Sequence, residues 1–120
     1  MLSTAHRLRR SADFQRVVRQ GRRASSRTVV LHCCMASSPV TPARVGFVVS
    51  KAVGNAVTRN VVKRRLREAV RGRLGTLDGQ VLVVRANPAS ADADFRQLSD
   101  DLDRCLTSMA QRADEKKVRR

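Results

Sequence analysis

Apolar residues recur at helical spacing in three stretches of the chain, and two of these lie near its ends. The first covers residues 11–20 and has Ser11 as its expected N-cap. The last has Ser90 or Asp92 as its expected N-cap and runs to about Gln111. Each carries an apolar stripe, which predicts that it packs on a core. The stripes consist of Phe14, Val17 and Val18, and of Phe95, Leu98, Leu102, Cys105, Leu106 and Met109.

Three β-rich runs separate the helical stretches: residues 28–35, 44–50 and 80–86. The first two are expected to pair in antiparallel fashion across the loop at 37–42, and residues 21–25 can add a short strand. The third run is apolar almost throughout, which suits a central strand covered on both faces. Because a helical stretch joins the second run to the third, these two strands are expected to be parallel and linked by a crossover.

The middle helical stretch begins at Ala56, with Asn55 as its expected N-cap and Gly75 at its expected C-terminal end. A helix turns by about 100° per residue, which sorts its side chains into faces. Here an apolar face of about 100° of arc adjoins a basic face of about 140°. The apolar face consists of Val62, Leu66, Ala69 and Val70, and the basic face of Arg59, Asn60, Lys63, Arg64, Arg67 and Arg71.

No acidic residue interrupts this basic face. Its members Arg59, Lys63, Arg67 and Arg71 stand four residues apart, and each such pair of like charges costs a helix about 0.2–0.5 kcal/mol. A helix that only contacts water usually interleaves acidic and basic residues. The pattern therefore favours a polyanion that binds this face over a solvated surface.

The order of elements is helix, two or three strands, helix, strand and helix. It predicts an α+β fold in one domain over residues 1–120, with a small mixed sheet packed by helices. Residues 1–10 are expected to form a basic N-terminal arm, and residues 112–120 a flexible charged tail.

The composition points to a nucleic-acid partner. The 25 basic and 10 acidic residues give a formal net charge of +15, and a charge this large opposes compaction unless a polyanion binds. No basic helix has a strong apolar insertion face, which argues against a membrane partner.

Cys33, Cys34 and Cys105 are expected to be buried as small apolar side chains and to be free thiols. Free thiols and the lack of an apolar N-terminal signal run predict a cytoplasmic protein.

The sequence offers no grouping of side chains for independent catalysis. His6 and His32 lie far apart, and half of the acidic residues fall within residues 92–103. A protein nuclease needs carboxylates for a metal ion or a histidine base, and the basic region contains neither arrangement. The sequence therefore predicts binding, with no catalytic residue, no metal held by the protein alone and no small-molecule substrate.

One block has a recognisable spacing: Lys51, Gly54, Asn55, Ala56, Val57, Arg59, Asn60, Lys63, Arg64, Arg65, Leu66, Arg67 and Glu68. This block resembles the signature of the bacterial ribonuclease P protein subunit family. Further similarities, in the same order, occur at Asp13 and Phe14, at Val45 and Gly46, and at residues 85–88. The resemblance implies a fold like that of ribosomal protein S5, with a left-handed β-α-β crossover.

The resemblance also implies a function. The chain would be a subunit of an endoribonuclease whose catalytic RNA uses Mg2+ to remove the 5′ leader of precursor tRNA, and its partners would be that RNA and precursor tRNA. By position, the catalytic RNA would contact Lys51, Asn55, Arg59, Asn60, Lys63, Arg64, Arg67 and Arg71. A cleft between the first helix and the sheet would hold the single-stranded leader with Phe14, Val18, His32 and Phe47.

This chain departs from the family pattern in its aromatic content, which is 2%. Family members often carry aromatic residues where Val18 and His32 stand, and this shifts the expected leader contact toward phosphates.

Two other hypotheses also account for the net charge of the chain. A small structural RNA-binding protein of ribosomal type has a similar size and charge. A stand-alone metal-dependent nuclease would rely on acids such as Asp100 or Asp101.

Overall fold

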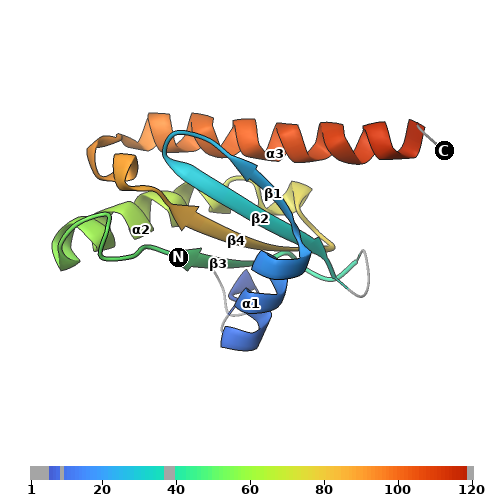
Figure 1. The fold of residues 1–120 in the computed structure, drawn as a ribbon, viewed down its shortest axis with the longest axis horizontal. Helices are drawn as coiled ribbons and strands as arrows, with labels where there is room; N and C mark the ends of the chain where they lie inside the picture. Colours follow the sequence, from blue (N-terminus) through green and yellow to red (C-terminus); the bar gives the residue numbers. More distant parts are fainter. Residues whose placement is uncertain (1–5, 9, 37–39, 119–120) are drawn as a thin grey trace.

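The computed structural model describes residues 6–8, 10–36 and 40–118, with side chains up to residue 110. Predictions for residues 1–5, 9, 37–39 and 119–120 lie outside the described residues. The order of elements is the predicted one, including the short first strand (Figure 1). The elements are α1 (Ser11–Gln20), β1 (Arg22–Ser25), β2 (Val29–Met35), β3 (Arg44–Val48), α2 (Ala56–Arg71), β4 (Gln80–Ala86) and α3 (Phe95–Val118), with short 3-10 helices η2 (Leu74–Thr76) and η3 (Pro88–Asp92).

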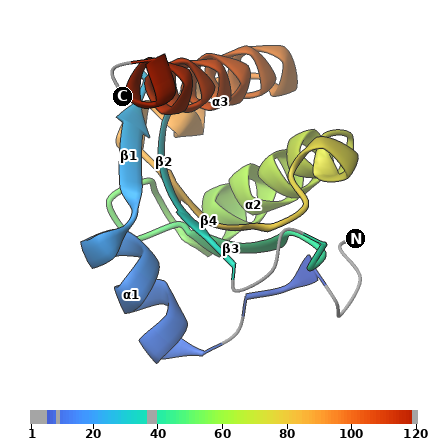
Figure 2. The same ribbon diagram turned by 90° about the vertical axis from the view of Figure 1, so that its right-hand side faces the viewer.

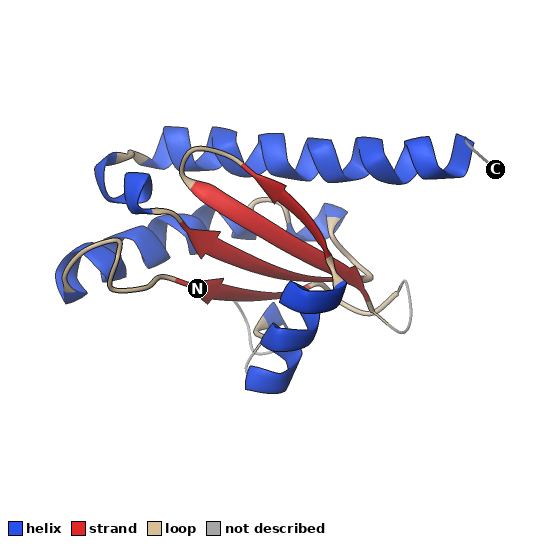
Figure 3. Cartoon of the chain, viewed as in Figure 1, coloured by secondary structure: helices blue, strands red, loops and turns tan. Residues whose placement is uncertain are grey.

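The four strands form one sheet in the order β1-β2-β4-β3 (Figure 3). β4 pairs with β2 in antiparallel fashion and with β3 in parallel. The predicted pairing of residues 28–35 with 44–50 is therefore wrong, because β4 lies between these strands. The physical reason is burial: the residues from Val81 to Val84 are all buried, and such a strand needs cover on both faces.

α2 connects the parallel neighbours β3 and β4, as the sequence predicted. In Figure 1 both strands run toward the left, β4 lies above β3, and α2 passes behind the sheet. The crossover is therefore left-handed, whereas about 98% of such connections are right-handed. The family resemblance implied this hand, and composition and spacing gave no sign of it.

The helices cover the two faces of the sheet unequally. α1 lies on one face, and α2 and α3 lie on the other (Figure 2). Alternate residues of β4 serve the two sides: Leu82 and Val84 belong to the larger core with α2 and α3, and Val81 and Val83 to the smaller core with α1. This division decides which side chains can share a site.

α2 has the predicted start and the predicted buried face. The Asn55 side chain accepts a hydrogen bond from the Thr58 backbone N–H at 2.9 Å. The apolar residues predicted for this face are all buried, namely Val62, Leu66, Ala69 and Val70. The end of the helix differs, because α2 stops at Arg71 and not at Gly75. Gly72 is the first glycine after the basic block, and glycine is a poor helix former, so the helix ends there.

The caps of the other two helices correct the predictions. α1 begins at Ser11, so the N-cap position is Arg10, which makes no side-chain capping bond. α3 is capped by Asp94, not by Ser90 or Asp92. The Asp94 carboxylate accepts from the Gln97 backbone N–H at 2.8 Å, and the Asp94 N–H donates to the Gln97 side chain at 2.9 Å. This reciprocal arrangement is a capping box.

α3 is longer than the helical pattern predicted, and the described part of the N-terminal arm contacts the sheet. α3 continues to Val118, past the predicted end at Gln111, because residues 112–118 contain neither Gly nor Pro. At the other end, the described part of the arm runs beside β3. The Leu8 N–H donates to the Val45 carbonyl at 3.1 Å, and Leu8 itself is buried.

Candidate nucleic-acid interface

Part of the predicted basic face of α2 lies around one hollow. Asn60, Lys63, Arg64 and Arg67 line a single hollow together with Glu68. Arg64 and Arg67 are exposed, and Lys63 is half-buried. Four of the eight predicted RNA-contacting residues are therefore brought together by one helix.

Most of the cations on this surface have no ion-pair or hydrogen-bond partner among the residues that the structure describes. Arg59, Lys63, Arg64 and Arg67 make no ion pair and no side-chain hydrogen bond with the described residues. The Arg59 Nε is also buried without a hydrogen-bond acceptor. A buried donor in this state costs about 1–3 kcal/mol, which an incoming phosphate oxygen can offset.

Arg71 differs from the other cations of the face. Its Nη2 lies 3.0 Å from the Glu68 carboxylate, one turn earlier on the same helix. Both side chains are about half exposed, so the pair contributes at most about 1 kcal/mol. The structure therefore places Arg71 at the margin of the basic surface, partly neutralised.

Residues 51–55 set the start of α2. Gly54 has φ +154°, and a Cβ there would lie 3.1 Å from the Thr58 side chain, so this turn favours glycine. The Asn55 side-chain oxygen is already engaged in capping, which makes Asn55 a structural residue of the entry turn. Lys51 is exposed in that turn, beside the helix N-terminus, where anions bind readily.

Two arginines, Arg65 on α2 and Arg73 just after it, serve the fold, and their contacts were not predicted. The Arg65 Nη1 donates to the Ala93 carbonyl at 2.8 Å. The Arg73 Nη2 donates to Ser99 Oγ and to the Asp103 carboxylate, both at 2.7 Å. The hydrogen bond from Arg73 holds the pKa of Asp103 below its usual value. Both arginines tie α2 to the α3 side, so they do not belong to the open basic surface.

The second predicted site lies on the α1 side of the sheet. The Phe14 ring lies against Gly46, where an added Cβ would be 2.2 Å from its Cζ. His32 faces the same side, because the register runs from His32 through Val83 to Gly46. Val18 is 38% exposed on α1. The structure therefore brings Phe14 and His32 to one face and leaves Val18 open to solvent beside them.

Phe47 does not belong with these residues. It packs against the larger core on the opposite face of the sheet. The reason is strand alternation: Gly46 faces α1, so its neighbour Phe47 faces away. The predicted placement of Phe47 in the α1 cleft is wrong.

His32 is buried, with 4% of its surface exposed, and neither ring nitrogen has a hydrogen-bond partner among the described residues. Burial lowers the pKa of His32, and the nearby Arg85 and Arg23 lower it further. The ring is therefore neutral at pH 7. An unsatisfied buried group of this kind costs about 1–3 kcal/mol.

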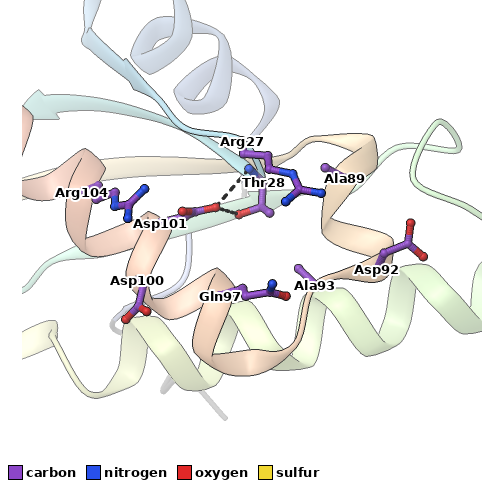
Figure 4. Close-up of a pocket in the computed structure, with 9 residues that line it drawn as sticks. All are labelled: Arg27, Thr28, Ala89, Asp92, Ala93, Gln97, Asp100, Asp101 and Arg104. Carbon is purple, nitrogen blue, oxygen red and sulfur yellow. Dashed lines mark hydrogen bonds between the residues drawn. The ribbon is translucent and has the colours of Figure 1, made fainter.

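A separate cavity of about 240 Å³ lies beside the start of α3 (Figure 4). It mixes Arg27 and Arg104 with three aspartates, and it shares no residue with the α2 hollow. Its Asp101 accepts hydrogen bonds from the Thr28 N–H and hydroxyl, so this carboxylate ties α3 to β2. Within the described residues, no three His, Cys, Asp or Glu side chains are grouped to hold a metal ion.

The cysteines behave as packing residues. Cys33 and Cys105 are buried, Cys34 is half-buried, and all three are free. Burial raises the pKa of the Cys33 thiol to about 11 and also raises that of Cys105.

In the part of the chain that the structure describes, no helix is both long and apolar enough to span a bilayer.

The fold and the surface define a class of protein. A small α+β domain with a charge of +15 and a helix face of unpaired cations is a nucleic-acid-binding protein of the ribonucleoprotein type. The family model for ribonuclease P matches residues 2–110, and the chain belongs to the ribonuclease P protein component family. This family supplies a subunit of ribonuclease P, a tRNA-processing endoribonuclease, which implies a ribonuclease P RNA as partner.

Individual relatives agree along nearly the whole chain. A ribonuclease P protein component of Nocardioides sp. is 56% identical over 109 residues, which cover 88% of this chain and 92% of that one. The one from Streptomyces griseus is 51% identical over 114 residues, covering 88% and 93%. The solved RNase P protein of Staphylococcus aureus has a TM-score of 0.80 at 30% identity, covering 88% and 96%. That of Thermotoga maritima has a TM-score of 0.70 at 27% identity, covering 80% and 90%.

Proposed function

We propose that this chain binds the catalytic RNA of ribonuclease P through α2 and the 5′ leader of precursor tRNA on the α1 side of the sheet. The observation that carries the proposal is the set of α2 cations without an internal acid, Arg59, Lys63, Arg64 and Arg67. Phosphate groups are the partners that such a surface lacks. Family membership selects ribonuclease P RNA over a ribosomal RNA as their source.

The physical contribution of the protein is charge neutralisation. Catalytic RNA and precursor tRNA are both polyanions and repel each other. Each lysine or arginine that contacts a phosphate releases condensed counterions, which makes association favourable and dependent on salt. Because the chain carries cations on two faces, it can contact both RNAs at once and reduce the Mg2+ that their association needs.

The chemistry of leader removal is assigned to the RNA. Among the described residues, no three His, Cys, Asp or Glu side chains are grouped as metal ligands, which is the arrangement that a metal site held by the protein alone would use. Asp101, a candidate acid for a protein nuclease, is hydrogen-bonded to Thr28. We therefore assign the Mg2+ and the cleavage step to the RNA subunit, and binding to this chain.

The leader site rests on a small set of residues. Phe14 and His32 face α1's side of the sheet, and Val18 lies on α1 beside them. Stacking of one base on an aromatic side chain contributes about 1–3 kcal/mol. Of the predicted cleft residues on this face, Phe14 alone has a six-membered aromatic ring. Base stacking at the leader site is therefore limited.

The test is reconstitution of cleavage. Precursor tRNA cleavage by the catalytic RNA at low Mg2+ is measured with the chain, without it, and with the chain alone. We expect the chain to raise the rate at low Mg2+ and to cleave nothing by itself. An absence of any gain ends the proposal. Cleavage by the chain alone, abolished by Asp100→Asn, supports the nuclease alternative instead.

A further inference from the structure

The cavity beside the start of α3 is bounded by three segments that lie far apart in the sequence. Its lining residues come from the turn between β1 and β2, from η3 and the residue after it, and from the first turns of α3 (Figure 4). The cavity has a volume of about 240 Å³. Pockets for drug-sized ligands hold about 300–1,000 Å³, so this cavity suits a smaller group.

Hydrogen bonds between the three segments fix the shape of the cavity. The Asn87 side chain, at the start of η3, donates to the Ser26 carbonyl of the β1–β2 turn at 3.1 Å. Asp101 on α3 accepts from the N–H and the hydroxyl of Thr28, which is buried. Because each wall is tied to another wall, the cavity is formed before a ligand enters, and binding has little of the protein left to order.

Two residues of opposite charge line this cavity without pairing. Arg27 and Asp92 are both exposed, and neither side chain makes an ion pair or a hydrogen bond within the described part of the chain. In Figure 4 the Arg27 guanidinium and the Asp92 carboxylate lie in the right half of the cavity. Asp100 and Arg104 lie in its left half. Two opposite charges that share a cavity but do not pair can both contact a ligand that bridges them.

The hydrogen-bonding capacity of Arg27 and Asp92 limits what can bridge them. A guanidinium donates two parallel hydrogen bonds, so Arg27 fits a pair of adjacent acceptors. An ionised carboxylate only accepts, so Asp92 fits a pair of adjacent donors. Among the RNA bases, guanine alone offers both pairs, with O6 and N7 as acceptors and N1–H and N2–H as donors. Ala89 and Ala93 add only methyl groups to the wall, which leaves room for a flat ring.

We propose that this cavity binds the base of an unpaired guanosine, with Arg27 donating to O6 and N7 and Asp92 accepting from N1–H and N2–H. The net charge of +15 favours a nucleotide over a zwitterion such as a free amino acid, because it attracts polyanions to the chain. The guanine belongs either to a free guanosine nucleotide or to an unpaired position of an RNA partner, and both present the same two edges. The site shares no residue with the α2 hollow, so it is separate from the proposed contact with catalytic RNA.

Calorimetric titration of the full chain with GMP and with AMP tests the recognition of the base. Both nucleotides carry the same ribose and phosphate, so non-specific charge attraction is equal for the two. One bidentate pair discriminates between bases by at least about fivefold, so we expect the wild-type chain to bind GMP at least about fivefold tighter than AMP. Arg27→Gln and Asp92→Asn each remove this preference. Arg96→Gln and Asp78→Asn, at exposed positions outside the cavity, retain it.

A second measurement separates the two sources of guanine. Asp92→Asn removes a negative charge, so charge alone predicts that it strengthens the binding of RNA, as does the matched control Asp78→Asn. If the guanine belongs to an RNA partner, Asp92→Asn instead weakens binding of catalytic RNA or precursor tRNA at least about fivefold relative to Asp78→Asn. If it belongs to a free nucleotide, both variants bind these RNAs equally well and GMP still binds the reconstituted holoenzyme.

The titrations also define the results that overturn the proposal. Equal affinities of the wild-type chain for GMP and AMP overturn it, and so does a GMP preference that survives both Arg27→Gln and Asp92→Asn. Competition by free glycine as strong as that by GMP assigns the cavity to zwitterions and overturns the guanine assignment. The mononucleotide titrations involve no RNA, so their failure is distinct from a failure of the reconstitution that tests the proposed function.

Discussion

Replacing Lys63 and Arg67 together by glutamine is predicted to stabilise the folded chain while it weakens RNA binding. On α2 these two residues take part in three like-charge pairs at four-residue spacing, with Arg59 and Arg71 as the outer members. Each pair costs about 0.2–0.5 kcal/mol, so their loss raises the free energy of unfolding by about 0.6–1.5 kcal/mol at low salt. Glutamine has nearly the helix propensity of lysine and arginine, so the backbone contributes little.

The assay measures both quantities on the same variants. Urea unfolding followed by circular dichroism gives the free energy of unfolding, and the gain is expected to shrink at high salt because the repulsion is screened. Titration of the catalytic RNA at several salt concentrations gives the affinity. Two lost phosphate contacts reduce the salt slope by about 1.4–1.8. Arg96→Gln with Arg104→Gln on α3 removes the same charge and serves as the control.

The opposite signs make the reasoning easy to refute. Replacing a residue that stabilises the fold, such as Arg73, lowers the free energy of unfolding of the chain. If the Lys63 and Arg67 variant is less stable than the wild type, the α2 cations have internal partners after all. If its RNA affinity equals that of the α3 control, overall charge and not the α2 surface accounts for binding.

Three further predictions concern the packing of the chain. Gly46→Ala places a Cβ inside the Phe14 ring, so thermal unfolding should show a loss of about 1–3 kcal/mol; a neutral result contradicts the Phe14 placement. Because Arg73 lowers the pKa of Asp103, their pair stabilises the fold above about pH 4 and this contribution is lost as the pH falls. Arg73→Met should therefore destabilise the chain more at pH 7 than at pH 3 in urea unfolding, and an equal effect excludes the ion pair as the cause. Cys33, with a pKa of about 11, should resist alkylation at pH 8 until the chain unfolds, as mass spectrometry can check; rapid labelling of the folded chain is the contrary result.

Local patterns predicted the parts of the fold that depend on local physics. The α2 core stripe and the Asn55 cap follow from helical periodicity and from one side chain next to the helix start. The sheet order depends on contacts far apart in sequence. The runs that became β2 and β3 are adjacent in the chain, and only the burial of β4 on both faces places it between them.

The candidate site also has parts that local patterns predicted and parts that they did not. The unpaired cations of α2 were predicted because one helix sets their spacing. Phe47 was assigned to the leader cleft by family resemblance, although its alternation with Gly46 would have placed it on the other face. The Asp94 cap had a local signal, a Gln three residues later.

The central claim is that α2, and not the α3 side, contacts the catalytic RNA, and lysine footprinting tests it directly. The chain has four lysines: Lys51 and Lys63 at α2, and Lys116 and Lys117 near the end of α3. Acetylation of each lysine is measured by mass spectrometry with and without saturating catalytic RNA. We predict that the RNA protects Lys51 and Lys63 while Lys116 and Lys117 keep their reactivity. Protection of the α3 lysines with Lys63 left reactive would contradict the account.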